Sequence, residues 1–225
     1  MPVAPRIPVH GGGSFAVRRI YCVGRNYLAH IREMKEGDER DPPFFFQKPA
    51  DAIVCSGERI PYPPQTVDLQ YEVELVVAIG SGGRDLSESQ ALDSVYGYAV
   101  GIDLTRRDRQ KESFAKGLPW EIGKSFDHSA PVGAIHRVAE VGHKLRGSIR
   151  LSVNGELRQS GDLGQMIWNV PEIVGKLSQS YRLHPGDLIM TGTPAGVGPV
   201  VVGDRIDAQV DGLSPLTVTI VEPEA

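Results

Sequence analysis

Two glutamates in the segment QYEVELVVAI, which covers residues 70–79, are the first candidates for chemistry. Apolar and polar residues alternate there, which predicts a β-strand with Glu72 and Glu74 on the same face. Side chains two residues apart on a strand lie roughly 7 Å apart, so both carboxylates could reach one cation. Asp103 directly follows the next apolar segment, GYAVGI, and three carboxylates converge if the two strands are neighbours. Such a cluster needs a cation to offset its charge, and oxygen ligands favour Mg²⁺ or Mn²⁺ over zinc.

His30 and Glu33 are the second candidate pair. They lie three residues apart in NYLAHIREM, whose apolar spacing predicts a short helix with both side chains on one face. Glu33 could therefore orient the imidazole and stabilise its protonated form. A histidine held in this way is suited to act as a general base that activates water.

A polar helix and a glycine-rich loop supply further candidates. Arg107 and Gln110 lie near one face of the helix expected for TRRDRQKESFAKG, and Lys124 follows in EIGKSF. In TGTPAGVGP, three glycines, two prolines and the hydroxyls of Thr191 and Thr193 predict a rigid loop whose amides could hold a carboxylate.

Each of these patterns also has a purely structural interpretation. An isolated ExE pattern more often marks the solvent face of an edge strand, although the position of Asp103 after an apolar run favours a cation site. His30 and Glu33 also fit a surface ion pair, and charged residues on a polar helix are usually solvated. The glycine-rich loop fits a structural turn about as well as a ligand site.

Several enzyme classes lack their sequence signals. The glycine-rich loop does not end in the Lys-Ser/Thr of a P-loop, and no GxGxxG motif precedes a helix. No GxSxG motif occurs, and neither cysteine lies near a histidine in the sequence. Nucleotide binding and nucleophilic serine or cysteine hydrolysis are therefore disfavoured.

Composition indicates a turn-rich β protein with a small ligand. The chain has 225 residues, of which 40% are hydrophobic, enough for a substantial core. Its 26 glycines and 17 prolines favour many turns over long helices. The formal net charge is −4 and no basic run occurs, which argues against nucleic acid or a charged membrane surface as partner.

The elements that must position the candidate residues are mostly short strands. RRIYCVG predicts a buried strand, and IRLSVNGELRQS predicts a hairpin around Asn154 and Gly155. LIM, RIDAQV and LTVTIVE predict further strands, and helices are expected in SESQALDSVYGY and PEIVGKLSQSYRLHPGD. Because turns connect most strands, we expect a mainly β protein with a few short helices (α+β), with a rolled or barrel-like antiparallel sheet.

Domain organisation and location are also expected from the sequence. The charged stretch KEGDERDPP, residues 35–43, predicts a surface loop. We expect residues 1–60 to form a small N-terminal subdomain with the catalytic helix, and residues 61–225 to form the catalytic β domain. Cys22 and Cys55 lie in apolar segments, the first residues lack the apolar core of a signal peptide, and no apolar run is long enough for a membrane span. A soluble, cytoplasmic protein is expected.

These motifs resemble those of the fumarylacetoacetate hydrolase superfamily. The resemblance runs through CVGRNYxxH, FQKP, YEVELxxxIG, GYAVGIDLTRRDRQ, GLPWxxGKSFD, VNGELRQ and LIMTGTPAGVGP, in the order of that family. Longer members contribute an additional aspartate ligand upstream of the histidine, and IYCVGRNY has no acid there. The chain therefore resembles the short, single-domain branch, and PFFFQKPADAIV is most similar to its fumarylpyruvate hydrolases.

The resemblance implies a role for each candidate. Glu72, Glu74 and Asp103 are implied as ligands of Mg²⁺ or Mn²⁺. His30 and Glu33 are implied as the dyad that activates water. The implied catalytic lysine is Lys124, and the implied substrate contacts are Arg25, Arg107, Gln110 and Thr193.

The resemblance also implies the reaction and the partners. We expect a hydrolase that cleaves the carbon–carbon bond of an acylpyruvate. The substrate that the resemblance implies is fumarylpyruvate, which is hydrolysed to fumarate and pyruvate in aromatic catabolism. Alternatives within the family are an oxaloacetate decarboxylase and a 2-hydroxyhepta-2,4-diene-1,7-dioate isomerase or decarboxylase. An alternative of another class is a non-catalytic protein that binds a 2-keto acid. A homodimer is implied as well.

Overall fold

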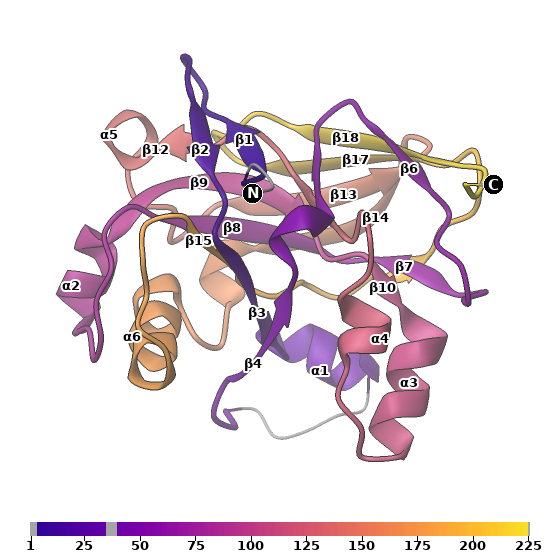
Figure 1. The fold of residues 1–225 in the computed structure, drawn as a ribbon, viewed down its shortest axis with the longest axis horizontal. Helices are drawn as coiled ribbons and strands as arrows, with labels where there is room; N and C mark the ends of the chain where they lie inside the picture. Colours follow the sequence, from indigo (N-terminus) through magenta and orange to yellow (C-terminus); the bar gives the residue numbers. More distant parts are fainter. Residues whose placement is uncertain (1–3, 35–39, 225) are drawn as a thin grey trace.

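The computed structural model describes residues 4–34 and 40–224. In this part of the chain, short strands form four sheets, and short helices lie at their ends (Figure 1). Residues 35–39 of the expected surface loop lie outside the described residues, while residues 40–43 precede strand β4 without regular structure.

An eight-stranded sheet is the centre of the fold. Its strand order is β4-β3-β15-β8-β9-β11-β5, and β12 also pairs with β9. Neighbouring strands are mostly antiparallel, but β3 with β15 and β5 with β11 are parallel. The strands are β3 (Arg19–Gly24), β4 (Phe44–Lys48), β5 (Ile53–Cys55), β8 (Val73–Ile79), β9 (Val95–Ile102), β11 (Ala130–Val132), β12 (His136–Arg137) and β15 (Asp187–Met190).

A five-stranded sheet packs against the central one. Its order is β14-β13-β17-β18-β6, from β6 (Arg59–Pro61), β13 (Ser148–Val153), β14 (Glu156–Asp162), β17 (Arg205–Val210) and β18 (Leu216–Val221). The smaller sheets are β10-β7-β16, from β7 (Leu69–Tyr71), β10 (Thr105–Arg106) and β16 (Gly198–Pro199), and the hairpin of β1 (Arg6–Pro8) and β2 (Ser14–Ala16).

The helices gather at two ends of the sheets. Helices α2 (Glu88–Asp93) and α6 (Val170–Ser180) pack together at one end, and α3 (Arg107–Ala115) and α4 (Glu121–Lys124) pack together at the other (Figure 1). The remaining helices are α1 (Leu28–Met34) and α5 (Val138–Val141), with single 3₁₀ turns at Ala50–Ala52 and Leu163–Gln165.

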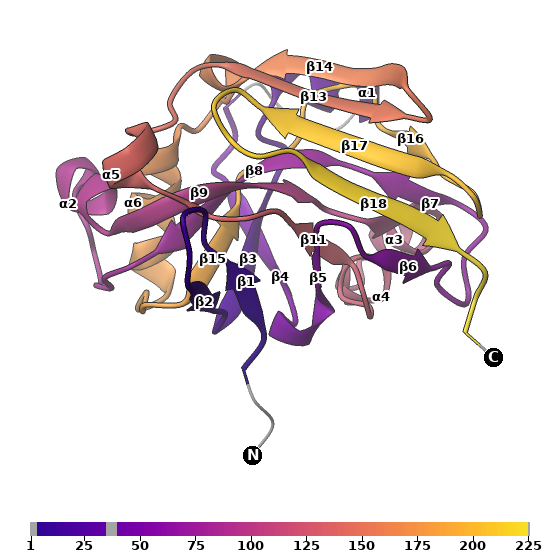
Figure 2. The same cartoon turned by 90° about the horizontal axis from the view of Figure 1, so that it is seen from above.

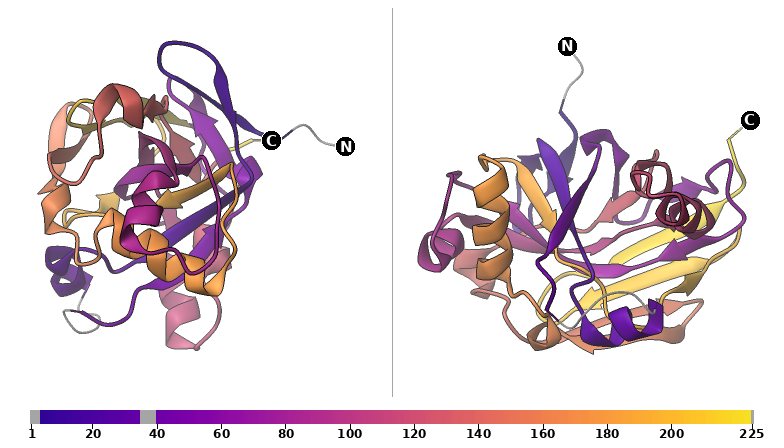
Figure 3. Two further views of the ribbon diagram at one scale, coloured as in Figure 1. Left: turned by 90° about the vertical axis from the view of Figure 1, so that its left-hand side faces the viewer. Right: turned by 90° about the horizontal axis from the view of Figure 1, so that it is seen from below.

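The central sheet is buried on both faces. One core cluster joins it to the five-stranded sheet, which lies over β8 and β9 (Figure 2). A second cluster lies on its opposite face, against the hairpin of β1 and β2. The sheets curl around the interior in the end-on view of Figure 3, which confirms the expected mainly β fold with a rolled, barrel-like arrangement.

Strand β8 explains how the glutamates become buried. Val73, Leu75 and Val77 belong to the first core cluster, whereas Val76 and Ala78 belong to the second. The predicted alternation is therefore confirmed for Val73–Ile79, and both faces of β8 are packed. The expected single strand over residues 70–79 is wrong, because it is interrupted at Glu72, which separates β7 from β8. β8 lies between β15 and β9, so the interpretation of the ExE pair as the solvent face of an edge strand is wrong.

Local signals placed several other elements correctly. Asn154 and Gly155 have φ of 52° and 82° and connect β13 to β14, as an Asn-Gly hairpin requires. Helix α2 begins with the capping box of Ser87 and Gln90. Helix α6 begins at a capping box from Asn169, has proline in its first turn, and buries Ile173, Val174 and Leu177.

The first 60 residues share the central sheet with later parts of the chain. Strands β3, β4 and β5, from residues 1–60, pair within the same sheet as β8 and β9. The division into a small N-terminal part and a catalytic part stays a prediction. None of the described helices has the length and apolar character needed to cross a membrane.

Candidate active site

One cleft brings together the residues singled out in the sequence. It has an empty volume of about 470 Å³ and is lined by every predicted site residue except Glu33. The lining residues come from α1, α3, α4, β3, β4, the ends of β8 and β9, and the glycine-rich loop after β15, which are far apart in the sequence. Val23, Ile31, Phe46 and Trp120 add apolar surface to its walls.

Three buried carboxylates converge in this cleft. Because β8 and β9 are antiparallel, the start of β8 lies beside the end of β9, and the amide of Asp103 donates to the carbonyl of Glu72 at 2.8 Å. Glu72, Glu74 and Asp103 are each no more than 5% exposed. Each offers a carboxylate oxygen, and the three oxygens lie within 4.8 Å of one another.

Buried cations face the carboxylates. The Nζ of Lys124 lies 2.8 Å from Glu72 Oε2 and 2.7 Å from Asp103 Oδ2. The Nζ of Lys48 lies 2.9 Å from Asp103 Oδ1, and the Arg107 guanidinium donates to Glu72 Oε1. These cations explain how so many acidic groups tolerate burial.

The cations do not neutralise the three carboxylates equally. Although burial opposes it, the charges of Lys124 and Arg107 hold the pKa of Glu72 well below its usual range. Burial and the neighbouring charges of Asp103 and Glu72 raise the pKa of Glu74 well above its usual range. Burial opposes the charged form of Lys124, but Asp103 and Glu72 raise its pKa. Glu74 is thus the carboxylate that most lacks a compensating charge.

This donor set suits a hard divalent cation. All three groups offer oxygen atoms, as Mg²⁺ and Mn²⁺ prefer, and no cysteine or histidine belongs to the cluster. A cation beside Glu74 would offset the repulsion that raises its pKa. The residues present therefore fit the metal that the sequence predicts.

The histidine and glutamate of α1 interact as their spacing predicts. His30 Nδ1 lies 3.4 Å from Glu33 Oε2, and His30 is 9% exposed at the wall of the cleft. Glu33 also accepts hydrogen bonds from the amide of Gly196, at 3.1 and 3.2 Å. The glycine-rich loop therefore fixes the carboxylate that orients the imidazole.

The predicted substrate contacts all reach the cleft. Arg107 and Gln110 are 2% and 7% exposed, so their interpretation as solvated surface is wrong. Arg107 Nη1 donates to Gln110 Oε1 at 2.6 Å, which ties their positions together. The guanidinium of Arg25 stacks 5.5 Å from the Phe44 ring centroid, and Thr193 lies in the glycine-rich loop.

The glycine-rich loop binds carboxylates of the protein itself. The amide of Gly192 donates to Glu74 Oε2 at 2.6 Å, as that of Gly196 does to Glu33. Gly192 has φ of +94°, and a Cβ there would lie 2.7 Å from Asn26 Cβ. Glycine is required at this position by both its conformation and its close packing.

Three buried residues of the site were not assigned a role from the sequence. Lys48 donates to the carbonyls of Leu104 and Lys124 besides pairing with Asp103. Asn26 and Gln159 use their amides to hold the glycine-rich loop, through the carbonyl of Thr191 and the hydroxyl of Thr193. Lys48 and Gln159 occur in FQKP and VNGELRQ, and only that resemblance could have drawn attention to them.

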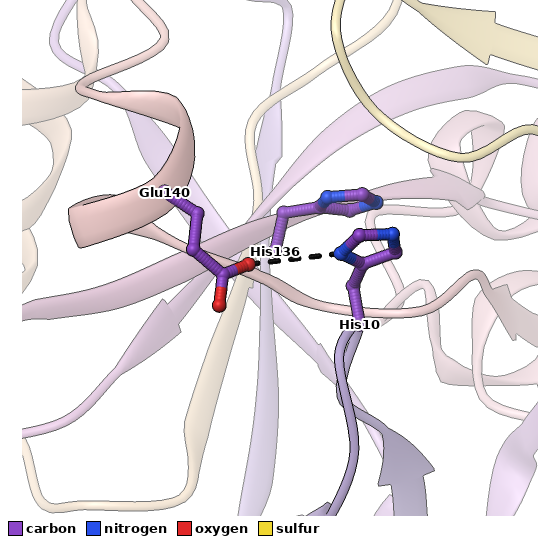
Figure 4. A group of neighbouring side chains, drawn as sticks. All are labelled: His10, His136 and Glu140. Carbon is purple, nitrogen blue, oxygen red and sulfur yellow. Dashed lines mark ion pairs between the residues drawn. The ribbon is translucent and has the colours of Figure 1, made fainter.

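A second cluster of ligand-type side chains lies away from the cleft, at His10, His136 and Glu140 (Figure 4). The two rings stack with centroids 4.2 Å apart, and His10 Nδ1 lies 3.7 Å from Glu140 Oε2. The amide of Ser214 donates to His136 Nε2 at 2.9 Å, which places the proton of the neutral ring on Nδ1. Neither nitrogen of His136 is then available to a metal in this arrangement.

The second cluster predicts a pH effect on stability. Burial and the neighbouring His10 lower the pKa of His136. The folded chain then binds fewer protons there than the unfolded chain, so this contribution to stability is lost as pH falls below about 6.5. Melting curves between about pH 7.5 and about pH 5.5 should show a smaller acid-induced drop for His136→Gln than for the unmodified protein. Equal drops would show that His136 does not control this effect.

Comparisons with known proteins show the family of the chain. The model of the fumarylacetoacetate (FAA) hydrolase C-terminal family matches residues 19–221. A fumarylpyruvate hydrolase from Ralstonia sp is 45% identical over 177 residues, which are 79% of this chain and 92% of that protein. The mitochondrial oxaloacetate tautomerase of Homo sapiens is 43% identical over 209 residues, which are 92% of this chain and 93% of that protein.

A solved structure is similar over nearly the whole chain. It is the crystal structure of fumarylpyruvate hydrolase from Pseudomonas aeruginosa in complex with Mn²⁺ and pyruvate. The identity is 50% and the TM-score 0.96, over 99% of this chain and 97% of that chain. Because the family model matches residues 19–221, the chain belongs to the fumarylacetoacetate hydrolase family.

Proposed function

We propose that the protein is a metal-dependent hydrolase that cleaves the carbon–carbon bond of an acylpyruvate, with fumarylpyruvate as substrate and fumarate and pyruvate as products. The observation that carries this proposal is the single cleft lined by three buried carboxylates and by His30, whose imidazole is hydrogen-bonded to Glu33. The fumarylpyruvate hydrolases at 45% and 50% identity support the choice of substrate.

Glu72, Glu74 and Asp103 are the proposed ligands of Mn²⁺ or Mg²⁺. When bound, the cation would supply Lewis-acid polarisation to the oxygens of a 2-keto acid. The proposal of Mn²⁺ is supported by the metal in the similar Pseudomonas aeruginosa structure, and Mg²⁺ by the oxygen-only donor set.

His30 is the proposed general base. It would take a proton from water while Glu33 holds the ring, and the resulting hydroxide would add to the carbonyl next to the bond that breaks. The water oxygen remains in fumarate, and a proton returns to the methylene carbon that becomes the methyl group of pyruvate. The Lys124 and Arg107 charges would stabilise developing negative charge on oxygen, and Arg25, Gln110 and Thr193 would orient the substrate.

Removal of the metal tests this function directly. Purified protein should convert fumarylpyruvate to equal amounts of fumarate and pyruvate with added Mn²⁺ or Mg²⁺, followed by ultraviolet absorbance and chromatography. Excess chelator should abolish turnover, because the cation is expected to supply several kcal/mol of stabilisation in the transition state. Turnover that persists in chelator, or no turnover with either metal, would refute the proposal.

Oxaloacetate tautomerisation is the second candidate. It is favoured by the 43% identity to the human oxaloacetate tautomerase over 92% of this chain. Tautomerisation moves a proton and needs no attacking water, so its product remains oxaloacetate. Faster keto–enol exchange of oxaloacetate without release of pyruvate would select this activity, while formation of CO₂ would select decarboxylation.

The proposal also covers the oligomeric state, the location and the metabolic role of the protein. We infer a homodimer in the cytoplasm that acts in aromatic catabolism, supported by the family to which the chain belongs and by the free thiols of Cys22 and Cys55. Light scattering after size-exclusion chromatography would test the dimer. The hydrogen bond between His30 and Glu33 argues against a protein that only binds a 2-keto acid.

A further inference from the structure

The loop 191–196 connects three parts of the candidate site. Its Gly192 amide binds Glu74 in the acidic cluster, and its Gly196 amide binds Glu33 beside the proposed base. Between them, Thr193 lines the cleft and is 2% exposed. The position of this loop therefore affects the cation site, the base and a substrate contact together.

Gln159 on β14 holds this loop from the second sheet. Its side chain is completely buried, and its Oε1 accepts a hydrogen bond from the Val73 amide at 2.9 Å. Its Nε2 donates to Thr193 Oγ1 and to the carbonyl of Pro194, each at 2.8 Å. Val73 lies between Glu72 and Glu74, so one amide joins the acidic strand to the loop.

The direction of the bond to Thr193 is determined by the backbone. A backbone N–H can only donate and a backbone carbonyl can only accept. Turning the Gln159 amide over would place its NH₂ against the Val73 amide and its oxygen against the Pro194 carbonyl. The NH₂ group must therefore face Thr193, and the hydroxyl oxygen of Thr193 must accept.

Close packing keeps Gln159 in this position. A Cβ at Gly196 would lie 2.2 Å from the carbonyl oxygen of Arg158, so the loop and β14 are in direct contact. The pairing of β13 and β14 also shifts between Leu151 and Ser152, next to the position opposite Gln159. Gln159 is the only side chain of β14 that is buried completely, whereas its neighbours Arg158 and Ser160 are exposed.

From this geometry we propose that Gln159 is a positioning residue that makes the Thr193 hydroxyl a hydrogen-bond donor to substrate. Because Thr193 Oγ1 accepts from Gln159, its hydrogen is left for another acceptor, and among the described residues no protein group takes it. Thr193 lines the cleft, so a ligand bound there can offer the hydroxyl an acceptor oxygen, such as a carboxylate or keto oxygen. This inference rests on the proposed function, which supplies a 2-keto acid as ligand.

Pyruvate binding to the Mn²⁺-loaded protein tests the coupling. We would compare Gln159→Met, Thr193→Val and the double variant. The dissociation constant of pyruvate would be taken from the change in the electron paramagnetic resonance spectrum of bound Mn²⁺ as pyruvate is added. Each single change should weaken pyruvate binding about tenfold, since a hydrogen bond to a charged group is lost. The double variant should bind no more weakly than Thr193→Val, because Gln159 acts through that hydroxyl.

One further readout and two further variants separate a positioning role of Gln159 from a general structural role. The Mn²⁺ dissociation constant should stay within about twofold of the unmodified protein in all variants, since the cation ligands are intact. Gln209→Met, the same change at an exposed position of β17, should leave pyruvate binding unchanged. Gln159→Glu repeats the test with a side chain closer in shape to glutamine. When ionised, it can still accept a hydrogen bond from the Val73 amide but cannot donate one to Thr193.

The outcomes distinguish this inference from the proposed function. Independent effects that multiply in the double variant, or an equal loss of Mn²⁺ affinity, would overturn the positioning role of Gln159. Failure of both Gln159 variants to fold would assign the residue to stability alone and would also overturn it. An unmodified protein that neither binds pyruvate nor cleaves fumarylpyruvate would instead refute the proposed function.

Discussion

Glu74→Gln is expected to weaken Mn²⁺ binding strongly while leaving the metal-free protein folded. Glutamine keeps the size of the side chain and can still accept the hydrogen bond from the Gly192 amide. It removes one of three anionic oxygen donors, so we expect Mn²⁺ affinity to fall about a hundredfold or more. Activity should fall roughly a thousandfold, because a cation supplies several kcal/mol in the transition state.

Thermal unfolding and calorimetry separate the two halves of this prediction. Saturating Mn²⁺ should raise the unfolding temperature of the original protein, by mass action, but not that of Glu74→Gln. Without metal, the variant should unfold at the same temperature or higher, because a like-charge contact with Glu72 and Asp103 is relieved.

Glu140→Gln is the matched control for the acidic cluster. It makes the same chemical change in the cluster of His10, His136 and Glu140, away from the cleft. Mn²⁺ affinity and turnover should be unaffected. If Glu140→Gln lost Mn²⁺ binding while Glu74→Gln kept it, the metal site would belong to the second cluster and the ligand assignment would be wrong.

His30→Asn should lower hydrolysis by about a hundredfold to ten-thousandfold, the range expected for loss of a general base. Because His30 is hydrogen-bonded to Glu33 and does not belong to the cluster of three carboxylates, Mn²⁺ and pyruvate should bind with unchanged affinity. Steady-state rates and the two dissociation constants, measured on the same preparation, would establish this separation.

Two companion variants define the role of the pair. Glu33→Gln can still accept the hydrogen bond from the Gly196 amide, but it stabilises the protonated imidazole less. The rate of hydrolysis is therefore expected to fall about tenfold. His143→Asn changes an exposed histidine, bonded to the Tyr98 hydroxyl at 2.9 Å, and should have no effect on rate. Weak Mn²⁺ binding in His30→Asn would identify His30 as a ligand and contradict its assignment as a base.

Local patterns were sufficient for much of the fold and for two pairs of residues in the site. Alternation in residues 70–79 predicts the strand and the shared face of Glu72 and Glu74, and helical spacing predicts the contact between His30 and Glu33. Both relations join residues two or three positions apart, where the geometry of one element determines which side chains meet.

The remaining site residues depend on partners distant in the sequence. A polar helix presents the same pattern whether Arg107 and Gln110 face water or a cleft, and only the contact with Glu72, 35 residues away, decides for the cleft. Lys48 is the last residue of β4, and only its ion pair with Asp103 after β9 places it in the site. The local sequence does not indicate that these side chains are buried, because burial depends on the elements packed around them.

The sequence by itself therefore determined the elements, the shared faces and, through resemblance, the family of this protein. Tertiary structure alone decided that β8 is central and that its start meets the end of β9, which closes the cluster of Glu72, Glu74 and Asp103. It alone decided that Gln159 is hydrogen-bonded to Val73, 86 residues away in the sequence, and to Thr193, 34 residues away. The physical reason is that periodicity specifies the face of one element, whereas convergence depends on which distant elements pair.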